Sequence, residues 1–141
     1  MGRPSTYNDE LGSAICRAVS TSTDSLQKIC AANVGFPCHQ TIWEWRIDHP
    51  TFGEAYARAK GAQADLLAAE ILEIANDSSR DTVTDEDGNE RCNHEWVHRS
   101  RLKIDARKWI ASKLMPKVYG DRVQSDTTLT VVHEDTLKDL T

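Results

Sequence analysis

The stretch that most constrains this chain is residues 51–75, TFGEAYARAKGAQADLLAAEILEIA, which holds no proline and is rich in Ala, Leu and Ile. This composition predicts one long helix, and Thr51 followed by Glu54 predicts a capping box at its start. One apolar stripe recurs at steps of three to four residues. It consists of Phe52, Ala55, Tyr56, Ala59, Ala62, Leu66 and Ala69.

A second stripe, made of Leu67, Ile71 and Ile74, lies on another side of the same helix. A helix that is apolar on more than one face must be covered on more than one face. The chain has only 141 residues with which to provide that cover. We therefore expect part of this helix to pack against another subunit.

Composition places the chain among soluble globular proteins of one or two small domains, with 39% apolar and 28% charged residues. No apolar run approaches the roughly 20 residues that a membrane span needs, so no membrane partner is expected. The start of the chain lacks the apolar core of a secretory signal. The cysteines form no CxxC pair, which favours reduced thiols in a cytosolic protein.

The first 50 residues read as three short helices: residues 8–20, a helix that starts at Asp24 with Gln27 as its capping partner, and a helix from Cys38 to just before Pro50. A glycine-containing turn before the third helix is typical of a helix-turn-helix module. The third helix would enter the major groove of DNA. The outward side chains that we predict to contact DNA are His39, Gln40, Thr41, Trp43 and Arg46.

Gln40 could read adenine, and Arg46 could reach guanine or a phosphate. Lys28 on the second helix and Arg3 on the N-terminal arm are the candidate phosphate contacts. Three-helix units with a glycine turn also serve as plain packing units, and both interpretations stay open at this point. Glu44 weighs against tight binding by one copy, whereas several copies together would bind through avidity.

Residues 76–95 are polar and acidic, and Asp87-Gly88 is a hairpin-turn signal within them, so the segment is either a small hairpin or a mobile loop. Cys92, His94 and His98 are metal-compatible side chains at close spacing. A fourth ligand is not evident, and we predict no metal site.

Residues 95–114 predict another helix, whose apolar stripe consists of Leu102, Ala106, Trp109, Ile110 and Leu114. Basic residues surround the stripe, and the segment 96–124 carries eight basic and two acidic side chains. They would pair with the acidic run or with a neighbour's Glu70 and Glu73, or form a basic collar in an oligomer. A turn is expected at residues 117–121.

The tail at residues 122–133 is rich in Val and Thr and predicts a strand. A lone strand is not stable in water, so strands from several subunits could close into a barrel. Residues 134–141 are either a docking peptide or a frayed end. The chain has no GxxxxGK[ST] loop, and Asp105 is a lone acid in a basic helix. We therefore expect neither an enzyme nor a cofactor.

The chain resembles the small terminase subunits of tailed bacteriophages, of the compact type found in phages and prophages of enteric bacteria. The resemblance rests on GRPSTY, QTIWEWRIDHPTFGEAYARAK, AAEILEIAND and above all RSRLKIDARKWIASKLMPKVYGDRV. It implies a mainly α fold: a helix-turn-helix domain at 1–50, central oligomerisation helices at 51–121 with an acidic loop at 76–95, and a C-terminal strand and tail at 122–141.

The resemblance also implies a homo-oligomeric ring of about eight to ten copies. That ring would bind the packaging-initiation site in double-stranded viral DNA and regulate the large terminase subunit, which the tail would contact. It would work in the cytoplasm of the bacterial host and be absent from the mature virion. The rival functions are a dimeric helix-turn-helix transcription regulator and a scaffold that binds only protein.

Overall fold

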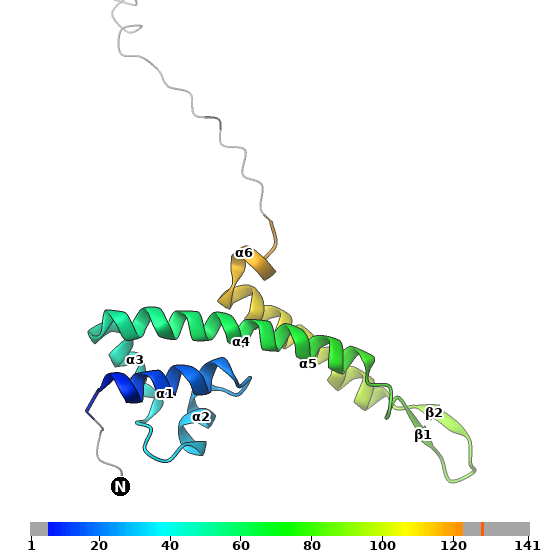
Figure 1. Ribbon diagram of the computed structural model, residues 1–141. Coiled ribbons are helices and arrows are strands. Elements are labelled where there is room, and N and C mark those ends of the chain that lie inside the picture. Colours follow the sequence, from blue (N-terminus) through cyan, green and yellow to red (C-terminus); the bar gives the residue numbers. More distant parts are fainter. Residues whose placement is uncertain (1–5, 123–127, 129–141) are drawn as a thin grey trace, which may run out of the picture.

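The structure, a computed structural model, describes residues 6–122 and residue 128. A long antiparallel pair of helices forms the body, and a head of three short helices packs beneath the first half of α4 (Figure 1). The elements in chain order are α1 (Asp9–Ser20), α2 (Leu26–Ala32), α3 (His39–Asp48), α4 (Pro50–Asn76), β1 (Thr82–Thr84), β2 (Glu90–Cys92), α5 (His94–Leu114) and α6 (Pro116–Tyr119). The prediction of a mainly helical chain is confirmed.

The core of the head joins α1, α2 and α3 to the first turns of α4. It consists of Ile15, Val19, Leu26, Ile29, Ile42, Trp45, Phe52, Tyr56 and Ala59. Tyr7 closes one end of this core, with its ring stacked on His49 at 3.9 Å and edge-on to Trp45 at 5.2 Å between centroids. The start of the chain is therefore packed onto the head from Tyr7 onward.

Local capping explains the helices whose ends agree with the sequence. The Asn8 side chain accepts a hydrogen bond from the Leu11 amide at the start of α1, and Asn93 does the same for the Trp96 amide of α5. Gly35, with φ of 94°, makes the turn before α3. A left-handed turn of this kind suits glycine because it has no Cβ.

Two predicted caps are wrong. α2 begins one residue later than expected, because Ser25, not Asp24, accepts the hydrogen bond from the Lys28 amide. α4 begins at Pro50, and no side chain caps it, so Thr51 and Glu54 form no capping box. Proline fits the first turn because its missing N–H would have no helical partner there.

The turn expected at residues 117–121 is replaced over Pro116–Tyr119 by the short helix α6, which folds back toward α4. The Tyr119 hydroxyl donates a hydrogen bond of 2.7 Å to Asp65 of α4. Gly53 allows the first turn of α4 to lie close to α3, because a Cβ there would lie 2.5 Å from the carbonyl oxygen of Arg46. α3 and α6 are therefore both fixed against α4.

Of the two structures expected for residues 76–95, the protein has the small hairpin. β1 and β2 pair antiparallel with Thr82 opposite Cys92 and Thr84 opposite Glu90. Gly88, with φ of 81°, lies in the turn. Asp85 holds the loop closed: its carboxylate accepts from the Asn89 amide and lies 2.8 Å from the Arg91 guanidinium. The hairpin extends from the end of the α4–α5 pair that is remote from the head (Figure 1).

α5 packs on α4 through a face other than the predicted stripe. The least exposed positions of α5 mostly recur at steps of three or four residues and are Trp96, Ser100, Ile104, Arg107, Ala111, Ser112 and Leu114. Of the predicted stripe only Leu114 belongs to this set, whereas Leu102 and Trp109 are 53% and 64% exposed. One chain therefore leaves most of the predicted stripe uncovered.

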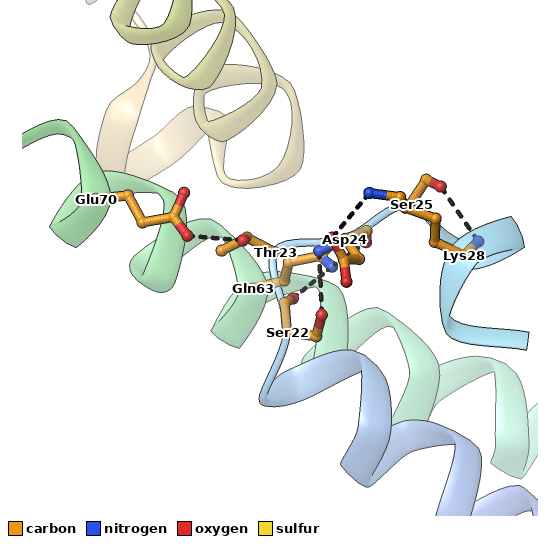
Figure 2. A network of polar contacts seen from close by, with 7 residues as sticks. All are labelled: Ser22, Thr23, Asp24, Ser25, Lys28, Gln63 and Glu70. Carbon is orange, nitrogen blue, oxygen red and sulfur yellow. Dashed lines mark hydrogen bonds and ion pairs between the residues drawn. The ribbon is translucent and has the colours of Figure 1, made fainter. Parts of the chain in front are cut away.

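Two side chains of α4 hold the α1–α2 loop (Figure 2). Gln63, which is 3% exposed, donates to the carbonyl oxygens of Ser22 at 2.7 Å and Asp24 at 3.2 Å. Glu70 accepts from the Thr23 hydroxyl at 2.7 Å and from Arg107 of α5 at 2.6 Å. Arg107 thus pairs with Glu70 of its own chain, and the carboxylate joins the head, α4 and α5.

We expect Glu70→Gln to lower the free energy of unfolding by about 1 kcal/mol at pH 7, because a half-buried ion pair still touches solvent. Burial of the Glu70 carboxyl raises its pKa, but the hydrogen bonds from Thr23 and Arg107 outweigh burial and leave the pKa below its usual value. A lowered pKa stabilises the fold above the ordinary glutamate value, and this contribution is lost as pH falls through the folded-state pKa.

Urea unfolding of the parent and of Glu70→Gln at pH 7 and pH 3 measures this contribution. The two proteins should differ at pH 7, and the difference should shrink at pH 3. Glu73→Gln is the matched control, because Glu73 is exposed on the same helix. An equal loss in both variants at pH 7, or a difference that is as large at pH 3 as at pH 7, contradicts the assignment.

Within the described residues, no helix combines the length and the apolar character of a membrane span. The predicted strand at 122–133, its barrel and the segment 134–141 lie outside the described residues, apart from Arg122 and Thr128. Arg3 also lies outside them.

Candidate nucleic-acid interface

The orientation of α3 follows from its two buried side chains. Ile42 and Trp45 point into the head core, so the opposite face of α3 meets solvent. That face carries Gln40, Trp43 and Glu44, and Ile47 extends it toward α4. The structure thus places Gln40 and Trp43 on the exposed side, as the sequence predicts.

The first turn of α3 is held by contacts within the helix. The Cys38 sulfur lies 3.3 Å from the Thr41 hydroxyl, and the hydrogen bonds from Thr41 lower the pKa of the Cys38 thiol. The His39 ring stands edge-on to Trp43 at 5.0 Å between centroids. His39 and Thr41 are both half-buried, so Gln40 and Trp43 are the more accessible side chains of this turn.

Arg46 lies at the other end of the exposed face, against α4. Its guanidinium carbon is 5.6 Å from the centre of the Tyr56 ring, within the range of a cation–π contact. Burial lowers the pKa of Lys60, and the positive charge of Arg46 lowers it further. The two cations therefore share one electrostatic environment although they belong to different helices.

A groove of 960 Å³ runs between α3, the start of α4 and the end of α5. Trp43 and Arg46 line it, together with Ile47, Lys60 and Lys113, which the sequence analysis did not select. Lys60 lies one helical turn after Tyr56, so helical spacing alone could have placed the two side chains on the same face of α4. Lys113 had no such signal, because only the return of α5 brings it here.

The remaining candidates lie apart from this groove. Lys28 is exposed on α2 and lies 3.8 Å from Asp24, one helical turn before it. Such an exposed pair is weak and leaves the ammonium available to a phosphate. Cys92, His94 and His98 are exposed where the hairpin meets α5. Across residues 6–122, no three His, Cys, Asp or Glu side chains gather closely enough to hold a metal ion.

Comparison with known protein families shows to which family this chain belongs. The sequence profile described as "Bacteriophage Sf6, terminase small subunit-like" matches residues 7–126. The chain belongs to this family. The resemblance found in the sequence is thereby confirmed, and the protein is a phage small terminase subunit.

Solved structures of the same family agree with the fold. Two variants of the terminase small subunit gp1 of the bacterial virus Sf6 are similar to this chain at 33% identity, with TM-scores of 0.67 and 0.68. Each match covers 94% of this chain and 93% of the other. A third variant of gp1, also 33% identical, covers 88% and 89% with a TM-score of 0.68. Among curated proteins, none matches the chain.

Proposed function

We propose that this small terminase subunit is a ring-forming, non-enzymatic DNA-recognition component. It binds the packaging-initiation site in double-stranded viral DNA and regulates the ATPase and nuclease of the large terminase subunit. Residues 1–50 recognise DNA, residues 51–121 build a ring of about eight to ten copies, and residues 122–141 form the barrel and contact the large subunit. It acts in the cytoplasm of the bacterial host and is not carried in the mature virion.

The observation that carries this proposal is the uncovered apolar face of α5 in a chain of this family. Leu102, Trp109 and Ile110 are all exposed, and they lie at helical spacing on one side of α5. Leu72 of α4 is exposed as well. Large contiguous apolar surfaces on a soluble chain mark interaction sites, and neighbouring copies would cover this one.

The DNA-recognition part is supported by the exposed face of α3. Gln40 and Trp43 are accessible there, while buried residues of the same helix fix its orientation. Arg46 adds a cation at the edge of this face. Glu44 is exposed between them, which lowers the affinity of one copy and makes avidity in a ring the main source of binding strength.

A native mass spectrum of the full chain tests the assembly. A ring of about eight to ten copies is expected. A dimer would instead support the helix-turn-helix transcription regulator, and a monomer at micromolar concentration would remove the basis of the proposal.

Arg46→Ala is expected to weaken binding to duplex DNA containing the packaging-initiation site by about tenfold or more. A contact to base or phosphate is worth about 1–3 kcal/mol and repeats in every copy. Gel-shift titration at two salt concentrations measures the affinity. Arg91→Ala is the control, because Arg91 lies on the hairpin remote from the head. Equal affinity of Arg46→Ala and the parent would overturn the assignment, and no DNA binding at all would favour a protein-only scaffold.

A further inference from the structure

The groove between α3, α4 and the end of α5 has features of a peptide-binding site. Its walls present the apolar side chains of Trp43, Ile47 and Leu114, and Ile47 is 79% exposed. Trp43 and Ile47 lie four residues apart on α3 and so form one continuous apolar strip. A strip of this kind accepts apolar side chains spaced by one helical turn.

The same groove is positively charged. Arg46, Lys60 and Lys113 come from three different helices and line it together. Glu54 is the only acidic side chain that lines it among the described residues. An occupant that combines apolar groups with negative charge would therefore fit it better than a neutral or basic one.

The C-terminal segment of this chain, residues 134–141, has that composition. Its sequence is EDTLKDLT, with Leu137 and Leu140 three residues apart. On a helical turn these two leucines would share one side. The charged residues of the segment are Glu134, Asp135, Lys138 and Asp139, so the segment is net negative.

The path of the chain brings this segment within reach of the groove. The hydrogen bond of 2.7 Å between Tyr119 and Asp65 fixes α6 to α4. Asp65 follows Lys60 of the groove by five residues, which is about 7.5 Å along a helix. In a chain whose residues 122–133 have not yet paired with strands of neighbouring copies, the segment from Arg122 to Leu137 can span about 50 Å when extended. The reach is therefore several times the separation along α4.

We propose that residues 134–141 dock in this groove, with Leu137 and Leu140 against Trp43 and Ile47 and the acidic side chains against the three cations. Because Trp43 and Arg46 are also the DNA-facing candidates, the docked segment and DNA would exclude one another. This consequence, unlike the docking itself, rests on the proposed function. Capture of the segment by the large subunit would then release the groove for DNA.

Photo-crosslinking of the full-length protein tests the docking without DNA. p-Benzoylphenylalanine is placed at Leu137, and the cross-linked peptides are mapped by mass spectrometry. We expect the cross-links to fall on α3 and the first turns of α4. Cross-links confined to other regions, or none after full irradiation, would overturn the docking.

Variants of the groove test whether its charge and its apolar strip hold the segment. Ile47→Asp combined with Lys113→Glu should reduce the cross-link yield at least fivefold, because it places negative charge on both sides of the groove. Lys108→Glu changes the same charge on the same helix but lies outside the groove, and it should leave the yield unchanged. Equal yields in the double variant and the parent would count against the docking.

The effect on DNA is measured separately by gel shift. Leu137→Ala combined with Leu140→Ala should raise the affinity for duplex DNA about threefold to tenfold. Unchanged affinity despite groove-directed cross-links would overturn the exclusion of DNA by the segment. Absence of DNA binding in every variant would instead refute the proposed function and leave the docking intact.

Discussion

Trp109→Glu is expected to convert the assembly into monomers at micromolar concentration while leaving the fold of each chain intact. Trp109 is 64% exposed on one chain, so the substitution removes little packing within it. In a ring the indole would be buried between copies, and a buried tryptophan at the centre of an interface contributes about 2–4 kcal/mol. That loss weakens each contact by about 30-fold to 1000-fold.

The loss recurs at every interface of a closed ring, so assembly should fail rather than weaken slightly. Native mass spectrometry and sedimentation measure the copy number, and circular dichroism verifies the helix content. Val34→Glu is the control, because Val34 is fully exposed in the turn before α3 and does not belong to α5. A Trp109→Glu protein that still forms the parental assembly would show that this face is not the interface.

The helix ends that the sequence predicted correctly depend on local chemistry. Asn8 accepts a hydrogen bond from the amide of Leu11 at the start of α1, and Pro116 follows the end of α5 at Leu114, whereas α5 begins one residue before the predicted Glu95. The start of α2 was wrong by one residue for a non-local reason. Gln63 of α4 binds the carbonyl oxygens on both sides of Thr23, which fixes the loop and leaves Ser25 as the cap.

The packing of α5 shows a second limit of sequence reasoning. Apolar spacing identified Leu102, Ala106, Trp109 and Ile110 as one face, but spacing does not say what covers that face. α5 contacts α4 through a stripe that includes Ser100 and Arg107, and Arg107 pairs with the carboxylate of Glu70 there. The sequence therefore located the apolar stripe of α5 but did not say which face of the helix contacts α4.

In the candidate site, too, the sequence predicted the residues that depend on local structure and missed those that depend on packing between helices. His39, Gln40 and Trp43 followed from the position of α3 after a glycine turn, which is local information. The convergence of Arg46, Lys60 and Lys113 on one groove did not, because it requires α4 to pass beside α3 and α5 to return to the same place. No spacing within one helix contains that arrangement.

Ile42→Ala is the substitution expected to destabilise the head most clearly. Ile42 is 0% exposed at the centre of the core that joins α1, α2, α3 and α4. Removing three carbon atoms from such a position costs about 2–4 kcal/mol, because the transfer free energy is lost and a cavity remains. The head is small, so this is a large part of the stability that a domain of its size has.

Ile47→Ala provides the same chemical change on the same helix, at a side chain that is largely exposed. It should alter the free energy of unfolding by no more than about 0.5 kcal/mol. Hydrogen exchange of the α1–α3 amides, at one fixed protein concentration, compares the two variants, because assembly would shift apparent stability by mass action. The amides of α5 should exchange alike in both. If the two variants lose equal protection in the head, Ile42 is not the residue that sets the orientation of α3, and the assignment of Gln40 and Trp43 to the DNA-facing side loses its structural basis.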